Sequence, residues 1–364
     1  MSNINKKFWK NKKVFITGHT GFKGGWICTL LKTLGCNITG YSLKPPTKPN
    51  LFEAAKIKSL LTKDYRNDII NLSALKKAVK KSKPDIIFHL AAQSSVIESF
   101  RNPTETIMTN IVGTANILEA AKESKTVKCL IIITTDKVYQ NYNIKNVFDE
   151  NSQLGGDDIY SGSKASCETI TNSYKKSFFS KHKCQIATVR AGNCFGGGDW
   201  TKDRIVKDTM ERFYNHKILI LRSPEATRPW QHVVEPIIGY LKLAEKLSSK
   251  KGIKYSGAWN FGPSTKQNLK VSQLVNLFKK EFNSRSKVVV IRKNKKFYNK
   301  KIKVFESTNL NISSKKAFKL LGWKSKLTVK ESVKLATKWF LDFKKRKSLA
   351  DTTKLQILNY LKNY

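Results

Sequence analysis

Short apolar runs alternate with longer amphipathic stretches through the first half of the chain. The short runs are rich in β-branched residues, which predicts strands at 13–17, 37–41, 85–90, 129–134 and 185–190. Between them, helical spacing of apolar positions predicts helices at 24–34, 73–81, 104–122 and 158–179. Alternating buried strands and helices are typical of a parallel sheet covered on both faces. Right-handed crossovers then predict an α/β fold with a doubly wound parallel sheet of Rossmann type.

The pattern becomes less regular in the second half of the chain. Loops are marked by Gly196-Gly197-Gly198, by Pro224 and Pro229, and by Gly262-Pro263. We therefore expect residues 1–188 to form a dinucleotide-binding domain. Residues 189–364 are expected to form mostly a smaller C-terminal substrate-binding lobe that includes the helical tail, with some segments returning to the first domain.

A glycine-rich loop with the spacing Gly-x-x-Gly-x-x-Gly directly follows the first predicted strand. Glycines between a strand and a helix can be simple turn residues. At this position, however, they also let backbone N–H groups at the helix N-terminus approach a pyrophosphate, which favours dinucleotide binding. The residues that we expect to contact the cofactor in this loop are Gly18, Thr20, Gly21, Phe22 and Gly24.

The second strand ends without the acidic residue that normally binds the adenosine ribose. Ser42 could bond a ribose, whereas Lys44 could accommodate a 2′-phosphate, so the residues leave both NAD and NADP open. His89 is most simply a buried core histidine. Further cofactor contacts are expected where the next strands end, from Asp68, Ile69, Leu90, Ala91 and Ala92.

Tyr160 and Lys164 lie four residues apart on a predicted helix and therefore share one face. A lysine ammonium beside a phenol lowers the pKa of the phenol from roughly 10, so Tyr160 could remove a hydroxyl proton while a hydride leaves the same carbon. Such pairs also occur on ordinary helix faces. Asp136 and Lys137 add an acid and a base that a plain oxidation does not require, which favours oxidation followed by elimination.

In this order, the motifs resemble those of the extended short-chain dehydrogenases/reductases that act on nucleotide sugars. Several longer strings are similar to those of the CDP-glucose 4,6-dehydratases. These strings span residues 18–24, 41–47, 134–139, 189–193, 196–200 and 226–232. The resemblance runs from about residue 8 to beyond residue 262, so it covers both predicted lobes.

The resemblance implies a lyase that converts CDP-glucose into CDP-4-keto-6-deoxyglucose and water with bound NAD. This is an early step towards deoxy sugars of bacterial surface polysaccharide, such as the O-antigen of lipopolysaccharide. It also implies that Tyr160 takes the C4 hydroxyl proton, that Lys164 binds the nicotinamide ribose, and that Thr135 donates a hydrogen bond to the C4 oxygen. Asp136 would protonate the departing C6 hydroxyl.

The role of Lys137 stays open. In the related dTDP-glucose dehydratases a glutamate at this position removes the C5 proton, and here the position is a lysine. A lysine is a base only when its surroundings depress its pKa well below roughly 10.4. Lys137 is therefore either the C5 base or a group that orients Asp136.

Substrate contacts are expected beyond the carboxyl ends of the strands, where open α/β sheets bind ligands. Arg190 and Asn193 stand at the end of the last predicted strand, and Arg228 could bind a diphosphate bidentately. A surface ion pair is the alternative for each arginine. The substrate set implied by position and resemblance is Gln93, Ser94, Asn193, Arg204 and Arg228.

The composition argues against a membrane-spanning, a secreted and a disulfide-bonded protein. The chain has 364 residues, of which 40% are hydrophobic, and no apolar run reaches the ~18 residues of a membrane span. Its first 13 residues are polar, unlike a secretory signal. The six cysteines show no Cys-x-x-Cys spacing. These features predict a reduced cytoplasmic protein without disulfides or a metal.

The charge is unusual, with 69 Lys and Arg against 26 Asp and Glu and a net charge of +43. Such an excess can mark a nucleic-acid binder. The basic residues are mostly lysines spread along the chain, which favours solvated faces and predicts neither a nucleic-acid nor a membrane partner. We expect a homo-oligomer of unspecified size.

Two alternatives to the dehydratase stay open. A nucleotide-sugar epimerase or reductase would use Tyr160 and Lys164 but leave Asp136 and Lys137 without a task. A basic polyanion-binding protein on an inactive dehydrogenase scaffold is the alternative from a different class, and the intact catalytic residues argue against it.

Overall fold

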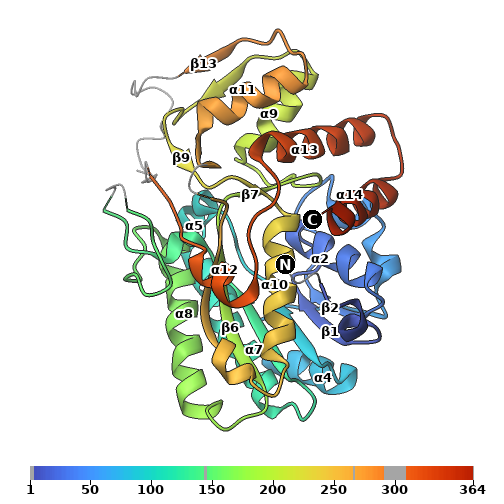
Figure 1. Cartoon of the computed structure of the whole chain (residues 1–364), viewed down its shortest axis with the longest axis vertical. Helices are drawn as coiled ribbons and strands as arrows, with labels where there is room; N and C mark the ends of the chain where they lie inside the picture. The colour runs from blue at the N-terminus through green and yellow to red at the C-terminus, as the bar shows by residue number, and fades with distance from the viewer. Residues whose placement is uncertain (1–3, 143–145, 265–266, 291–308, 364) are drawn as a thin grey trace.

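A parallel sheet of seven strands, in the order β11-β6-β5-β4-β1-β2-β3, forms the centre of the protein (Figure 1). The computed structural model describes residues 4–142, 146–264, 267–290 and 309–363. The strands are β1 (Lys13–Thr17), β2 (Asn37–Ser42), β3 (Lys63–Arg66), β4 (Ile86–His89), β5 (Cys129–Ile133), β6 (Gln185–Ala191) and β11 (Gly257–Phe261). All neighbouring strands are parallel, which confirms the predicted doubly wound α/β fold.

Two helical layers bury the two faces of this sheet. Successive side chains of a strand point to opposite faces, so Val14 and Ile16 of β1 join one apolar core and Phe15 joins the other. The first core lies under α2 (Phe22–Thr33) and α10 (Val234–Leu247). The second lies under α4 (Leu72–Ser82), α7 (Gly113–Glu123) and α8 (Ile159–Phe178). Burial on both faces explains why β1, β4, β5 and β6 read as apolar runs, whereas the edge strand β3 is polar.

The helix predicted at 104–122 is interrupted in the structure by a π-helical turn, η2 (Met108–Val112), between α6 (Pro103–Ile107) and α7. Asn110 within this turn accepts a hydrogen bond from the backbone N–H of Gln93 (2.9 Å) and donates one to Ser163 on α8 (2.8 Å). π-helical turns of this kind are frequent at functional sites. The turn ties the loop after β4 to the helix that carries Tyr160.

A second group of helices, α9 (Ile205–Tyr214), α11 (Val271–Glu281) and α13 (Val329–Lys344), surrounds an apolar core of its own at the top of Figure 1. The C-terminal helix α14 (Leu349–Asn363) packs against both α13 and α2, and so joins this group to the central sheet's cover. β11 and α10 also belong to the central sheet and its cover, although they follow residue 189. The division of the chain into two lobes at residues 188 and 189 stays a proposal.

The remaining elements are short or lie at the edges. The helices are α1 (Lys6–Trp9), α3 (Leu51–Ala54), η1 (Ile57–Leu60), α5 (Val96–Arg101), η3 (Asp136–Val138), η4 (Gly252–Tyr255) and α12 (Lys315–Leu321). The strands pair as β7 (Cys194–Phe195) with β10 (Gln231–His232), β9 (Thr227–Arg228) with β12 (Leu269–Lys270), and β8 (Leu219–Leu221) with β13 (Val288–Val290).

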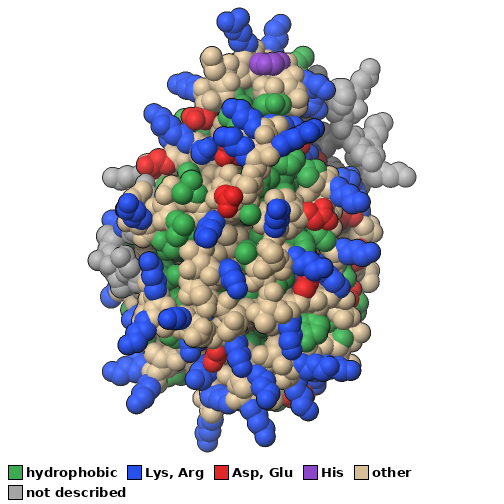
Figure 2. Space-filling model, turned by 90° about the vertical axis from the view of Figure 1, so that its right-hand side faces the viewer, with side chains coloured by type: hydrophobic (Ala, Val, Ile, Leu, Met, Phe, Trp, Pro, Cys, Tyr) green, Lys and Arg blue, Asp and Glu red, His purple; other side chains and the backbone are tan. Residues whose placement is uncertain are grey.

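The six cysteines are free thiols, and five of them are buried. Within the described ranges, no helix combines the length and the apolar character of a membrane span. Those ranges also contain no cluster of His, Cys, Asp and Glu side chains suited to a metal ion. Lysine and arginine side chains are scattered over the face shown in Figure 2 rather than gathered in one patch.

Candidate active site

The glycine-rich loop forms a tight cradle between β1 and α2. Gly18 has a positive φ of 73°, and a Cβ there would lie 2.6 Å from the backbone nitrogen of Ala91. A Cβ at Gly24 would collide with the carbonyl of Gly18. α2 begins at Phe22, two residues earlier than predicted, after Gly21, which caps the helix without a side chain. The free N–H groups at this helix end therefore fit a pyrophosphate, as the sequence predicts for a dinucleotide.

The loops after the neighbouring strands close around this cradle. The hydroxyl of Thr20 lies 2.9 Å from that of Ser42 at the end of β2. The segment of Asp68 and Ile69 is held through its carbonyls, which accept hydrogen bonds from Tyr41 (3.0 Å) and Asn116 (3.0 Å). All of these groups lie at the carboxyl edge of the parallel sheet, where the cofactor contacts were predicted.

The residues after β4 join the same edge. The backbone N–H groups of Leu90 and Ala91 donate to the carbonyl and the hydroxyl of Thr17, at 3.1 Å each. His89 is buried between the hydroxyls of Thr17 and Thr114, at 2.8 and 3.3 Å. Burial and the Lys164 ammonium lower the pKa of His89 to about 3, so the imidazole is neutral and has a structural part.

The turn after β5 carries the predicted acid and base. Thr135 caps the short helix η3, because its hydroxyl accepts a hydrogen bond from the backbone N–H of Lys137 (3.4 Å). The same hydroxyl donates to one carboxylate oxygen of Asp136 (3.2 Å). Thr135 and Asp136 are buried, and Lys137 is partly buried. Three polar side chains thus stand in sequence at the carboxyl end of a central strand.

Asp136 has the unusual environment in this turn. Its side chain is 3% exposed, and its Oδ2 atom has no hydrogen-bond partner among the described residues. Burial raises the pKa of this carboxyl, and the charges of Lys137 and Arg228 offset only part of the effect. A carboxyl with a raised pKa retains its proton more readily, as a general acid requires.

Tyr160 lies in the first turn of α8, with its hydroxyl near Thr135 and Asp136. The expected lowering of its pKa is not what the structure gives. Burial raises the pKa of the Tyr160 phenol, although the Arg204 guanidinium and the Thr135 hydroxyl act in the opposite direction. The prediction considered only the charge of Lys164 and left out desolvation, which disfavours the phenolate.

Lys164 lies one helical turn after Tyr160 and is 5% exposed. Its ammonium donates a hydrogen bond to the carbonyl of Ile133 at the end of β5 (3.2 Å). Burial lowers the pKa of Lys164. The helix and the strand that carry the predicted catalytic residues are therefore joined directly beneath the site.

Lys23 of the glycine-rich loop is a functional candidate that the sequence reasoning missed. Its ammonium lies 5.8 Å from the ring centre of Tyr240 and is close enough to Asp136 and Tyr160 to lower the pKa of both. The loop motif directs attention to its glycines. The signal that could have revealed Lys23 is a cation in the first turn of a helix, where the dipole disfavours positive charge.

The predicted substrate residues divide into two groups. Arg204 reaches from the start of α9 to the carbonyl of Ser94 (3.2 Å), so these two residues lie together near Tyr160. The side-chain amide of Gln93 instead donates to the carbonyl of Ser95 in its own loop (3.0 Å) and to the Thr106 hydroxyl on α6 (2.8 Å). The substrate contacts of these residues stay predictions.

Asn193 and Arg228 lie on the side of the second group of helices. The carbonyl of Asn193 accepts a hydrogen bond from Gln231 (3.1 Å), and its side chain is partly exposed. Arg228 is 3% exposed and close enough to Asp136 to lower the pKa of that carboxyl. Both residues stay candidates for substrate binding, on the grounds of position and resemblance alone.

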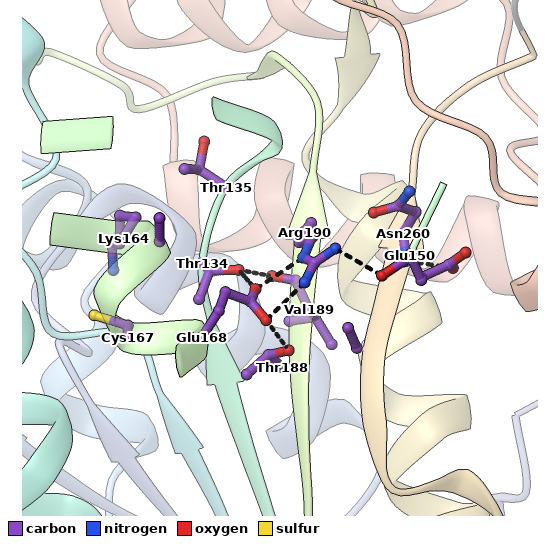
Figure 3. A network of polar contacts seen from close by, with 12 residues as sticks. Thr134, Thr135, Glu150, Lys164, Cys167, Glu168, Thr188, Val189, Arg190 and Asn260 are labelled. Carbon is purple, nitrogen blue, oxygen red and sulfur yellow. Dashed lines mark hydrogen bonds and ion pairs between the residues drawn. The ribbon is translucent and has the colours of Figure 1, made fainter. Parts of the chain in front are cut away.

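Arg190 does not face the substrate side of the sheet, contrary to what its position near the end of a strand suggested. It is 3% exposed and forms a buried ion pair with Glu168 of α8, in which Nε lies 2.9 Å from Oε1 and Nη2 lies 3.0 Å from Oε2 (Figure 3). The expectation that it binds substrate is therefore wrong, because its side chain points into the layer between β6 and α8. Glu168, four residues after Lys164, was missed as its partner.

Comparisons with known proteins identify the family of this chain. The family model described as GDP-mannose 4,6 dehydratase matches residues 15–336. The chain is 35% identical over 363 residues to CDP-glucose 4,6-dehydratase of Salmonella typhimurium, which covers 98% of each chain. It is 28% identical over 338 residues to human dTDP-D-glucose 4,6-dehydratase, which covers 90% of each.

Solved structures share the fold at lower identity. dTDP-glucose 4,6-dehydratase from Bacillus anthracis, in complex with NAD, matches with a TM-score of 0.74 at 18% identity, over 93% of this chain and 99% of that one. UDP-glucose 4-epimerase from Thermotoga maritima, with UDP-glucose, matches with a TM-score of 0.75 at 21% identity, over 91% and 99%. These likenesses concern the fold. The extent of the family match shows that this chain belongs to the GDP-mannose 4,6 dehydratase family, among the extended short-chain dehydrogenases/reductases that the motifs resemble.

Proposed function

We propose that the protein is a CDP-glucose 4,6-dehydratase that uses bound NAD to convert CDP-glucose into CDP-4-keto-6-deoxyglucose and water. The observation that carries this proposal is the buried Asp136 next to Thr135 and Tyr160, with a raised pKa and with no hydrogen-bond partner for Oδ2 in the part of the chain that the structure describes. An oxidation site gains nothing from such an acid unless a hydroxyl must leave. The full-length relationship to the Salmonella enzyme supports CDP-glucose as the substrate.

The glycine cradle and Lys164 are the groups that would hold the cofactor. NAD held there would supply hydride transfer, as an acceptor towards C4 of the sugar and a donor towards C6. Tyr160 accepts the proton of the C4 hydroxyl, and Thr135 donates a hydrogen bond to the C4 oxygen. Asp136 gives a proton to the departing C6 hydroxyl, which completes the loss of water together with removal of the C5 proton.

Lys137 is the candidate for removal of the C5 proton, and its place directly after Asp136 supports that role. The same place would also let it act only through Asp136, since its charge lowers the pKa of that carboxyl. Arg204 and Arg228, the two cations nearest to Tyr160 and Asp136 on the substrate side, would bind the diphosphate.

The test is to incubate the purified protein with CDP-glucose that carries deuterium at C4. We expect a product with the alkali-induced absorbance of a 4-keto-6-deoxy sugar, deuterium at C6 and no net NADH. A product that keeps its C6 hydroxyl would favour a nucleotide-sugar epimerase instead. Stoichiometric NADH would favour a dehydrogenase, and consumption of added NADH or NADPH would favour a reductase.

We further propose that the protein works in the cytoplasm as a homo-oligomer, in deoxy-sugar synthesis for a surface polysaccharide such as an O-antigen. The free cysteines support a reducing compartment. Exposed apolar side chains on contacting helices, Ile107, Met108 and Ile159, support an oligomer. Light scattering tests this part, because a monomer at micromolar concentration would contradict it.

A further inference from the structure

The buried ion pair between Glu168 and Arg190 has a position that packing alone does not explain. Glu168 follows Tyr160 and Lys164 at intervals of four residues, so all three share one face of α8. Its carboxylate accepts from both Arg190 donors and from two threonines, Thr134 Oγ1 (2.6 Å) and Thr188 Oγ1 (2.5 Å). Figure 3 shows the Glu168 carboxylate between α8 and the strands, with Lys164 and Thr135 nearer to the carboxyl edge of the sheet.

This pair holds both ends of the catalytic turn. Thr134, which donates to Glu168, directly precedes Thr135. Tyr139 directly follows η3, and its hydroxyl accepts a hydrogen bond from Arg190 Nη1 (2.8 Å). The Tyr139 hydroxyl donates in turn to Asn260 of β11 (2.7 Å). The segment between Thr134 and Tyr139 contains the predicted acid and base, so its two ends and α8 are fixed to one charge pair.

Both side chains of the ion pair are already engaged by protein groups. Each carboxylate oxygen of Glu168 accepts two hydrogen bonds, and Arg190 donates from Nε, Nη1 and Nη2 to the partners described above, so neither residue offers a group to the substrate. Burying two charges costs free energy that their attraction does not always recover, so a buried pair is weak evidence for stability. Its hydrogen bonds do fix geometry, because the guanidinium fork meets the carboxylate in one orientation.

We infer that Glu168 and Arg190 are positioning residues, which set the distance between Tyr160 and Lys164 on α8 and the acid and base on the turn after β5. This inference rests on the proposed function, because it assigns Tyr160 to oxidation and the turn to elimination. If the turn is free to shift, a sugar oxidised at C4 is not presented correctly to Asp136 and Lys137. Loosening the pair should therefore slow the elimination more than the oxidation.

Two conservative variants test this without removing either charge. Thr134→Val removes the hydrogen bond from the start of the turn to Glu168, and Tyr139→Phe removes the bond from its end to Arg190. Thr188→Val is the matched control, because it removes a bond to the same carboxylate from β6, away from the turn. Each variant keeps the shape of its side chain, so each should fold with a small fall in Tm, although Tyr139→Phe also loses the hydrogen bond to Asn260.

We expect Thr134→Val and Tyr139→Phe to lower kcat about 10- to 100-fold with KM for CDP-glucose within about threefold of wild type. Reduced cofactor should accumulate on adding CDP-glucose, visible as near-ultraviolet absorbance. Thr188→Val should keep kcat within about twofold and show no such accumulation. If all three variants lower Tm alike but leave kcat and the cofactor signal unchanged, the pair has only a structural role.

The proposed function and the positioning role are tested by different measurements. Wild-type turnover of CDP-glucose tests that function, whereas the ratio of variant to wild type tests the positioning role. If the wild type prefers another nucleotide sugar, the same ratios are measured with that sugar. A fall in kcat that is equal in all three variants would overturn the inference, since it would reflect loss of the ion pair's packing and not of the turn's position.

Discussion

Replacing Asp136 by asparagine should separate stability from activity, because the burial that makes this carboxyl a good acid also destabilises its ionised form. The folded-state pKa of Asp136 is raised, so the proton is held more tightly in the folded chain than in the unfolded one. The stabilisation from this proton is complete at low pH and is lost as pH rises through the folded-state pKa. Wild-type stability at pH 8 therefore includes the full penalty for burying the charge.

The size of the effect follows from the linkage. Each pKa unit by which burial raises the value corresponds to about 1.4 kcal/mol of lost stability at high pH. At about 2.1 cal/mol/K of unfolding entropy per residue, a chain of 364 residues shifts its Tm by ~1.3 °C per kcal/mol, so each unit is worth roughly 2 °C. Asparagine has the same shape and no charge, so Asp136→Asn should melt above wild type at pH 8, by a margin that shrinks towards pH 4.

Activity should change in the opposite sense. Loss of a general acid lowers a rate typically ~10²–10⁴-fold, which is about 2.7–5.5 kcal/mol in the barrier. Oxidation at C4 does not need Asp136, so the variant should trap reduced cofactor on adding CDP-glucose. The assays are melting curves at pH 4, 6 and 8 and turnover at pH 8, with the exposed Asp351→Asn as the control that should change neither.

Two results would refute this reasoning. One is an Asp136→Asn protein that keeps more than about a tenth of wild-type turnover, which would remove Asp136 from the proton transfer. The other is a Tm difference that does not grow with pH, which would show that the carboxyl is ionised without penalty in the folded protein.

Three further substitutions test the other groups of the site. Tyr160→Phe should lower activity by orders of magnitude without forming reduced cofactor, and more than about a tenth of residual activity would show that another group is the base. Lys137→Ala should oxidise C4 but stop before water loss; normal exchange of the C5 proton with solvent in this variant would leave Lys137 only an orienting part. Lys23→Met should raise the pKa of Tyr160 and so move the acidic limb of the kcat–pH profile to higher pH, whereas the exposed Lys32→Met on the same helix should leave the profile unmoved.

Five of the seven strands could be predicted because burial on both faces leaves a local signal, a short run of apolar residues. The edge strand β3 lacks this signal, because its sequence is polar and none of its side chains is fully buried. β11 was missed as well, since it contains Asn260 and pairs with β6 across more than sixty residues of intervening chain, so only tertiary pairing defines it. The π-helical turn at Asn110 was missed for a similar reason, since its contacts with Gln93 and Ser163 come from distant segments.

The candidate site shows the same limit at the level of single residues. Residue types and spacing pointed to Asp136, Tyr160 and Lys164, and the family resemblance pointed to Thr135; the structure brings these side chains to one edge of the sheet. Their protonation could not be predicted, because it depends on desolvation. The charge of Lys164 suggested an acidic phenol, yet burial raises the pKa of Tyr160. The charged neighbours of a titratable group are easier to predict from sequence than the burial of its side chain.

Arg190 shows that a residue near the carboxyl end of a strand does not always face the ligand site of an open sheet. Ligands bind beyond the carboxyl ends of the strands, but Arg190 is still within β6, which ends at Ala191. A side chain inside a strand points to one of its faces, and here that face is covered by α8. An arginine there must find a buried partner, and Glu168 supplies it. Asn193, two residues beyond the end of the strand, is free of that constraint, so an offset of only three residues separates a group that organises the site from one that can face the substrate.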